Sequence, residues 1–143
     1  MSASTANRDS KKKDGLLISY AMGAVKINKG TFVFIQAADG YAYSGRSVAT
    51  ITDVMAGVAF EGVNNSGGTA GASSIKVEQA GTYSFIAASA TQTWVGLPAY
   101  AADDQTVGIA SATTKIQVGQ IVEYISSTEV RVRIDNAIGT SVV

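Results

Sequence analysis

The side chains best suited to chemistry in this chain are carboxylates, and their spacing does not bring them together. Asp103 and Asp104 are adjacent. On a strand, neighbours point to opposite faces, and in a turn such residues bond their own backbone, so the pair favours a turn over a shared proton or metal. A weak calcium site there is the alternative. The remaining acidic residues of interest stand singly on strand-like segments, where solvated carboxylates are expected: Asp53, Glu61, Glu78, Glu123 and Glu129.

Two residue types that usually carry chemistry are missing. The 143 residues contain no histidine and no cysteine. The chain therefore lacks the usual general base near neutral pH, the thiol nucleophile and the commonest zinc ligands, and it has no disulfide framework. A Gly-rich loop at residues 64–72 fails as a phosphate cradle, because it lacks the Gly-Lys-Ser/Thr ending and leads into a strand. We expect no enzyme activity, no cofactor and no metal site.

Cationic side chains cluster near the N-terminus. They outweigh Asp9 and Asp14 by two charges, although the whole chain has a formal net charge of zero. Such a cluster is either a solvated tail or a docking site for an acidic partner surface, and it is too small to indicate nucleic acid binding. A neutral body gives no general attraction to nucleic acid or to acidic membranes. The cluster consists of Arg8, Lys11, Lys12 and Lys13.

The leading segment is predicted to be an extended arm. Residues 1–15 contain no valine, isoleucine, leucine or aromatic residue, so they lack the apolar surface needed to offset the entropy of ordering. We expect the arm to gain order from a neighbouring protein, with docking on its own domain as the alternative. Residues 16–20 have strand propensity, so Leu16, Leu17, Ile18 and Tyr20 either add a strand to a partner sheet or pair within their own domain.

The sequence contains neither a membrane-spanning segment nor a signal peptide that can be recognised. No run of about 18 apolar residues is present, as a membrane-spanning helix would need. The basic cluster is followed by too few apolar residues to form a signal peptide. The sequence predicts a soluble intracellular product, with an arm over residues 1–24 and one domain over residues 25–143.

The body alternates with a period of two. Residues 129–135 read EVRVRID, and they follow a β-branched and aromatic stretch at 119–125 across a short polar turn, which predicts a hairpin. Residues 98–101 and 106–109 predict a second hairpin. Residues 87–94 favour either one helical turn or a loop.

Further strands are predicted upstream. They lie at residues 31–36, 41–44, 54–62, 74–79 and 81–86, with a break at Ala80–Gly81 and with Val54, Ala56, Val58 and Phe60 on one face. Turn signals every 8 to 12 residues indicate an all-β fold, a small antiparallel β-sandwich or a partly open barrel.

Trp94 is the only tryptophan. It is either a core residue or an interface anchor, because tryptophan is enriched among contact hot spots. With Tyr41 and Tyr43 it would form a stacking platform for a glycan.

Several short motifs occur in a recognisable order. They read KGTFVFI (29–35), MAGVAFEG (55–62), SIKVEQAGTY (74–83), LPAY (97–100), IQVG (116–119) and VRVR (130–133). The order, over residues 26–135, resembles the small β-rich decoration proteins, or cement proteins, of tailed bacteriophages. The sequence departs from that family in its IQVG motif, where Ile-Gly is usual, and in its longer N-terminal arm.

The resemblance implies a structural virion protein with no active site. Such a protein is made in the host cytoplasm, binds the major capsid protein on the outside of the expanded head, often as a trimer, and bridges neighbouring subunits. Our candidate contact residues are Arg8, Lys11, Lys12, Lys13, Leu16, Leu17, Ile18, Tyr20 and Trp94. A head-fibre or host-surface module that binds glycans is the alternative function.

Overall fold

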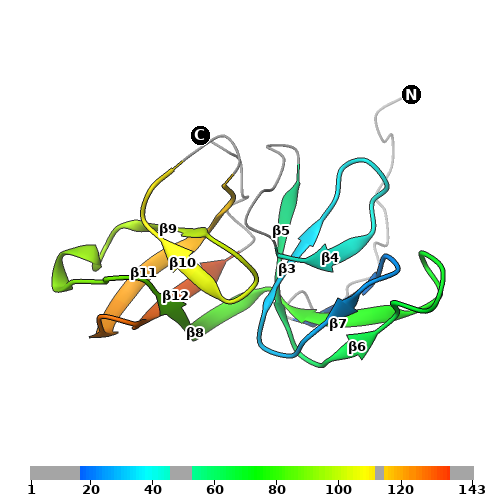
Figure 1. Ribbon diagram of the computed structural model, residues 1–143, viewed down its shortest axis with the longest axis horizontal. Coiled ribbons are helices and arrows are strands. Elements are labelled where there is room, and N and C mark those ends of the chain that lie inside the picture. Colours follow the sequence, from blue (N-terminus) through cyan, green and yellow to red (C-terminus); the bar gives the residue numbers. More distant parts are fainter. Residues whose placement is uncertain (1–16, 46–52, 112–114, 136–143) are drawn as a thin grey trace, which may run out of the picture.

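The computed structural model describes residues 17–45, 53–111 and 115–135, which fold into two all-β lobes (Figure 1). The first lobe, called the sheet lobe, holds β1 to β7, and the second, called the barrel lobe, holds β8 to β12. The strands of the sheet lobe are β1 (Leu17–Ala21), β2 (Lys26–Ile27), β3 (Phe32–Ile35), β4 (Ala42–Ser44), β5 (Val54–Ala59), β6 (Val63–Asn64) and β7 (Ser74–Glu78). Those of the barrel lobe are β8 (Ala80–Ala87), β9 (Pro98–Ala101), β10 (Thr106–Gly108), β11 (Gln117–Ser126) and β12 (Glu129–Asp135).

The sheet lobe is a curled antiparallel sheet. Its strand order is β1-β7-β5-β3-β4, and β2 pairs with β6 in a separate two-stranded ladder. At one end the curl brings the two edges together, because Met22 bridges to Ala42 and the Gly23 N–H donates to the Ala42 carbonyl at 2.9 Å. Near Leu17, β1 pairs only with β7 among the described residues. The lobe is therefore closed at one end of β1 and open at the other.

The barrel lobe is a closed five-stranded barrel with the order β10-β8-β12-β11-β9. Its pairings are antiparallel except for the short parallel contact between β10 and β8. Both predicted hairpins are confirmed, β11 with β12 and β9 with β10. Of the two structures left open for residues 87–94, a helical turn is present as a 3-10 helix, η1 (Gln92–Trp94). The prediction of an all-β fold is confirmed.

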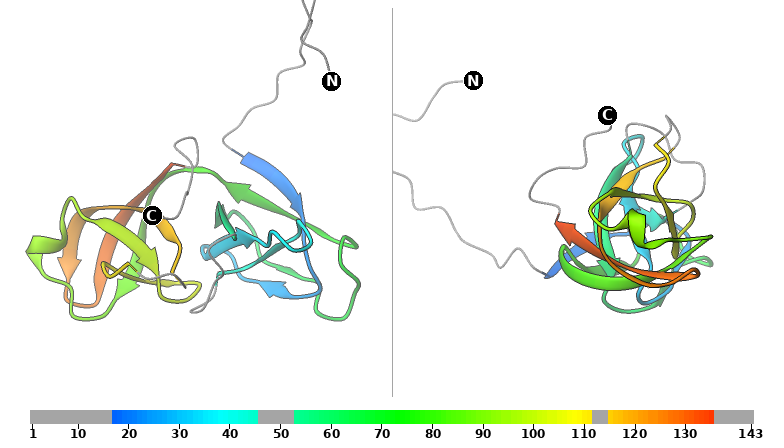
Figure 2. Two further views of the ribbon diagram at one scale, coloured as in Figure 1. Left: turned by 90° about the horizontal axis from the view of Figure 1, so that it is seen from above. Right: turned by 90° about the vertical axis from the view of Figure 1, so that its left-hand side faces the viewer.

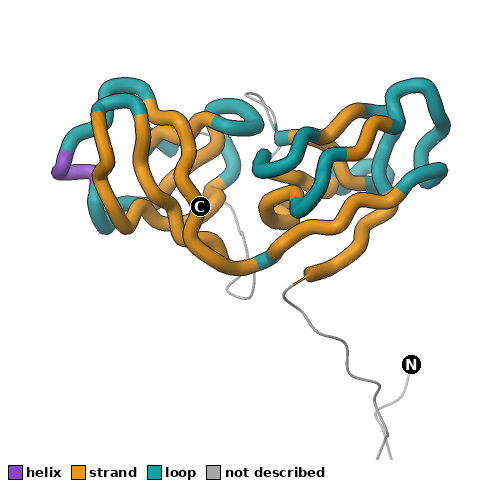
Figure 3. Tube along the Cα trace, turned by 90° about the horizontal axis from the view of Figure 1, so that it is seen from below, coloured by secondary structure: helices purple, strands orange, loops and turns teal. Residues whose placement is uncertain are grey.

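One long strand path joins the lobes, and the predicted break between two strands is present but falls at Gln79, one residue before Ala80–Gly81. β7 ends at Glu78 and β8 begins at Ala80, so the chain runs from the sheet into the barrel almost without interruption (Figures 2 and 3). Gly81 has φ of +134° and still pairs with Ile134 of β12. The glycine therefore accommodates an unusual backbone conformation inside a ladder, where the sequence pattern indicated a turn.

β5 departs from the predicted alternation. Met55 and Val58 belong to one core cluster, whereas Ala56 and Ala59 belong to the other. The ladder with β3 shifts register between Val33 and Phe34, which places an extra residue in β5 next to Gly57. A β-bulge reverses the facing of the side chains that follow it, so the expected single face from Val54 to Phe60 does not form.

A shared hydrophobic core holds the lobes together. The larger cluster includes Phe32 and Phe34 of β3 as well as the inward side chains of the barrel. The rings of Phe32 and Phe85 stack with centroids 4.1 Å apart. The turn between β9 and β10 docks on the sheet lobe, because the Asp104 carbonyl accepts from the Phe32 N–H at 2.8 Å. Ser44 Oγ also donates to Asp104 Oδ2 at 3.2 Å.

The Gly-rich loop at residues 64–72 is organised by a buried amide. Asn65 Nδ2 donates to the carbonyls of Gly23 and Thr69, both at 3.0 Å, and Asn65 Oδ1 accepts from Ser73 Oγ at 3.3 Å. Asn65 is only 4% exposed, so these bonds are shielded from water. The loop is thereby tied to the turn that follows β1.

Candidate functional site

The exposed edge of β1 is the first candidate contact surface. The Met22 N–H donates to the Ser73 carbonyl at 3.0 Å, so this pair is hydrogen-bonded across the β1 and β7 ladder. Antiparallel ladders alternate bonded and non-bonded pairs, which makes Ser19 and Lys76 a non-bonded pair. The Lys76 carbonyl indeed accepts from Phe60, on the side away from β1. The N–H and C=O of Ser19 therefore point away from β7, toward the free edge.

The side chains of β1 divide between the two faces of the sheet. Leu17 and Ser19 are exposed, and Ile18 and Tyr20 are half-buried. Tyr20 packs against the core of the sheet lobe, its hydroxyl accepts a hydrogen bond from Gln79, and burial raises its pKa. The edge thus offers backbone groups and a Leu17 side chain, whereas Tyr20 is occupied within its own chain.

The predicted arm and domain boundary can be compared with the structure only in part. Arg8, Lys11, Lys12, Lys13 and Leu16 lie outside the described residues. Leu17–Ala21 pairs with β7 along its whole length, so this part of the predicted arm over residues 1–24 belongs to the sheet. Of the two pairings left open for this segment, the one within its own domain is formed.

Trp94 takes a core role in part, and its role as an interface anchor stays a prediction. Its side chain packs against the barrel core and is also partly exposed. It lines an apolar recess of about 340 Å³ together with Tyr100, Ile109 and Lys115. The recess lies on the outer wall of the barrel, beside η1, β9 and β10.

The aromatic platform of the alternative function does not form. Tyr41 and Tyr43 lie at β4 in the sheet lobe, whereas Trp94 lies in η1 at the far end of the barrel lobe (Figure 3). Tyr43 donates its hydroxyl to Asp39 Oδ2 at 2.6 Å. This bond, with a second from the Tyr41 N–H, lowers the pKa of the exposed Asp39 carboxyl. The tyrosines therefore serve a local turn.

The acidic pair forms a turn, as the sequence predicts. Asp103 Oδ1 accepts from the backbone N–H groups of Gln105 and Thr106 at 2.8 Å and 2.7 Å. Asp104 instead contacts Ser44 across the lobes. The described part of the chain holds no group of three ligands suited to a metal ion.

Two of the single carboxylates differ from the solvated arrangement that the sequence predicts. Asp53, the residue before β5, is only 4% exposed. Glu78 is half-buried and accepts a hydrogen bond from the Tyr83 hydroxyl. Desolvation, and then the Glu78 carboxylate, raise the pKa of Tyr83 to about 12.

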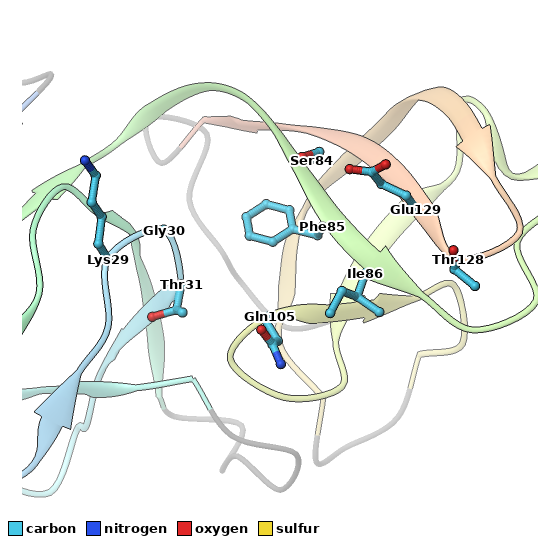
Figure 4. A pocket seen from close by; sticks show the side chains of 9 residues that line it. All are labelled: Lys29, Gly30, Thr31, Ser84, Phe85, Ile86, Gln105, Thr128 and Glu129. Carbon is cyan, nitrogen blue, oxygen red and sulfur yellow. The ribbon is translucent and has the colours of Figure 1, made fainter.

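A second recess of about 410 Å³ lies between the lobes (Figure 4). Lys29, Gly30 and Thr31 of the sheet lobe form one side, and Ile86 and Glu129 of the barrel lobe are among those that form the other. Thr31 Oγ1 donates to the Asn28 carbonyl at 2.7 Å, which directs that hydroxyl to its own loop.

Among the described helices, none is long and apolar enough to cross a membrane.

No protein-family model matches the chain, and no curated protein matches it. The resemblance to decoration proteins therefore stays a prediction that rests on the motifs of residues 26–135.

Sequence reasoning missed two exposed apolar residues, Val95 and Leu97, next to Trp94. A signal for them was present, because residues 79–102 contain no charged side chain. Such an uncharged run gives an apolar surface wherever its side chains reach solvent.

Proposed function

We propose that this chain is a structural virion protein that binds the outer surface of a phage capsid. It contacts the major capsid protein, stabilises the lattice by bridging neighbouring subunits, and acts as a homo-oligomer, with a trimer favoured. It performs no reaction and uses no cofactor, nucleic acid or membrane. It is synthesised in the host cytoplasm and resides on the capsid exterior.

The observation that carries the proposal is the open edge of β1. Edge strands are normally protected from pairing by charge, proline or a bulge. Leu17–Ala21 has the sequence LISYA, with no charge and no proline, and its ladder with β7 has no register shift. The outward N–H and C=O of Ser19 are thus a suitable template for a strand of another protein.

The position of this edge in the chain supports a bridging role. The basic cluster and the rest of the leading segment come directly before Leu17 in the sequence. A fully extended segment as long as residues 1–16 spans on the order of 50 Å. A strand added to β1 and a contact made by the arm would act together, and linked contacts raise the overall affinity well above that of either one.

Capsid binding tests the proposal directly. Heads of the phage that encodes the chain, expanded and free of DNA, are mixed with the full chain and sedimented. Deletion of residues 1–16 removes the arm and keeps β1, whereas a longer deletion would remove the edge strand of the sheet. We expect this deletion to lower the occupancy of the heads at least tenfold.

Two substitutions at one position isolate the contribution of the edge. Ser19→Pro removes an outward N–H and keeps the ladder with β7, so it blocks an added strand at that residue. Ser19→Ala keeps the N–H and is the matched control. We expect Ser19→Pro to weaken binding at least tenfold and Ser19→Ala to bind as the unchanged chain does. Full occupancy by both the deletion and the Ser19→Pro chain would reject the proposal.

A further inference from the structure

The beginning of β1 and the end of β12 lie on the same side of the path that β7 and β8 form. The Ser73 carbonyl, which comes just before β7, accepts from the Met22 N–H beside β1. At the other end of the path, the Ala87 N–H of β8 donates to the Thr128 carbonyl beside β12 at 2.9 Å. Odd-numbered residues thus face β1 in the first strand and β12 in the second, and alternate residues of a strand present their backbone groups to one side. Both views of Figure 2 show the end of β12 next to the beginning of β1.

These two strands follow one another in the same direction. Both are antiparallel to the path, where β12 ends at Asp135 opposite Ala80 and β1 begins at Leu17 opposite Glu78. The two positions are about 7 Å apart along the path. The place that β12 would take next, beside β7, is therefore held by β1. The chain that follows Asp135 has to leave the ladder at the beginning of β1.

The free backbone groups of β1 are close to this exit. Ser19 lies opposite Lys76, about 13 Å further along the path than Asp135. We call residues 136–143, which lie outside the described residues, the trailing segment. A segment of this length reaches about 26 Å when it is extended, so it can run past Ser19. It would run parallel to β1 without reversing, on the side of β1 where Ala42 makes its parallel bridge to Met22.

The composition of the trailing segment suits an added strand. It reads NAIGTSVV, which has no charge and is rich in β-branched residues. The edge that it would cover is uncharged as well, and the Leu17 side chain there is 37% exposed. Free proteins usually cover or block such an edge, because it otherwise pairs with other chains.

The leading segment is a poorer candidate for the same place. Residues 1–16 come directly before Leu17, so they would have to reverse direction in a hairpin before they could pair with β1. They also contain the basic cluster and lack β-branched apolar residues. The position and the composition both favour the trailing segment.

We propose that the trailing segment adds to β1 as a parallel strand in the free chain and covers the N–H and C=O of Ser19. The free chain then has a protected edge. A strand of the capsid protein takes the place of the trailing segment on the capsid, so the segment regulates access to the edge. This displacement rests on the proposed function, whereas the pairing of the trailing segment with β1 does not.

Amide hydrogen exchange of the free chain, followed at single residues by NMR, tests the inference without capsids. The N–H of Ser19 is the probe, and the N–H groups of Ile18 and Tyr20, which face β7, are the internal controls. We expect the Ser19 amide to exchange at least about tenfold faster in a chain that lacks residues 136–143, with the two controls nearly unchanged. A Gly-Ser segment of equal length in place of these residues should have the same effect as the deletion, because it lacks strand propensity.

Equal exchange of the Ser19 amide in the unchanged chain and in the deletion would overturn the inference. Protection that is lost only on deletion of residues 1–16 would overturn it as well, because the leading segment would then be the cover. Protection that grows with protein concentration would assign the cover to a second copy and have the same consequence.

Binding to expanded heads tests the displacement separately. The chain that lacks residues 136–143 is expected to bind with a dissociation constant lower by about threefold or more, because no segment has to leave the edge first. Equal or weaker binding would contradict the displacement. If no form of the chain binds heads, the proposed function fails and the exchange result still decides whether the trailing segment covers β1.

Discussion

The two lobes solve the problem of sheet edges differently. The barrel lobe closes its strands into a ring, so it can present to a partner mainly side chains such as Val95 and Leu97. The sheet lobe closes only near Met22 and leaves the backbone of β1 unpaired around Ser19 among the described residues. The sheet lobe therefore leaves backbone groups of β1 unpaired, whereas the strands of the barrel lobe are paired on both sides.

The same comparison raises the question of whether the lobes are independent. They share a core through Phe32 and Phe85, and they are linked by the nearly continuous path of β7 and β8. A contact made at one lobe is therefore fixed in position relative to the other, as the proposed bridging role requires.

The largest effect is expected at the joint. Phe32→Ala removes a ring that is fully buried and stacked on Phe85, which should lower the free energy of unfolding by about 3 to 5 kcal/mol. Urea denaturation followed by circular dichroism should show one transition at lower urea. Two separate transitions, or a loss below about 1 kcal/mol, would show that the lobes do not depend on this contact.

The next effect concerns the close packing of the sheet lobe. Gly57 has φ of +144°, and a Cβ there would lie 2.1 Å from the Glu78 carbonyl oxygen. Gly57→Ala should therefore cost about 3 kcal/mol, from backbone strain and overpacking. Gly67→Ala is the matched control, since a Cβ at Gly67 meets nothing within 4 Å. Equal thermal stability of the two variants would contradict the close approach of β5 and β7.

A smaller effect is expected in the Gly-rich loop. Asn65→Ala leaves the Gly23 and Thr69 carbonyls without the amide donor, which should cost about 2 kcal/mol. Amide hydrogen exchange across residues 64–72 should accelerate. The exposed Thr69 provides the comparison, because Thr69→Ala keeps the carbonyl that Asn65 bonds and should leave exchange across the loop nearly unchanged. Similar exchange in both variants would count against a structural role for the buried amide.

The smallest effect lies where β7 passes into β8. Because the pKa of Tyr83 is raised from 10.0 to about 12, the unfolded chain loses its phenolic proton before the folded chain does. The free energy of unfolding should therefore fall as the pH rises from 10 toward 12. The fall should be shallower in Tyr83→Phe, which also loses about 1 kcal/mol at neutral pH. Urea midpoints measured across this range provide the test, and identical slopes would exclude Tyr83 as a source.

Much of the fold could be predicted from local patterns. The β11 and β12 hairpin followed from the alternation at residues 129–135, and the Asp103 turn followed from side-chain bonding to the backbone. The β5 faces could not be predicted, because the bulge at Gly57 depends on the partner strand β3. The continuity at Gly81 likewise depends on its pairing with β12, and glycine is equally common in turns.

The candidate site was only partly predictable. The strand propensity of Leu17, Ile18 and Tyr20 indicated a strand, but its partner β7 is distant in the sequence. Trp94 was identified from its residue type alone, whereas the exposure of Val95 and Leu97 depends on how the loop is bonded to β11. The lack of charged residues over 79–102 was the one available signal for the exposed surface at Val95 and Leu97.

The binding of the full chain to capsids tests the central claim most directly. Expanded heads of the phage proposed to encode the chain are incubated with the chain, separated on a density gradient and imaged by cryo-electron microscopy. The account predicts density for the chain on the outer surface at symmetry-related positions, with β1 next to a strand of the capsid protein. Heads that carry no chain at saturating concentration, or chains bound with β1 facing solvent, would contradict it.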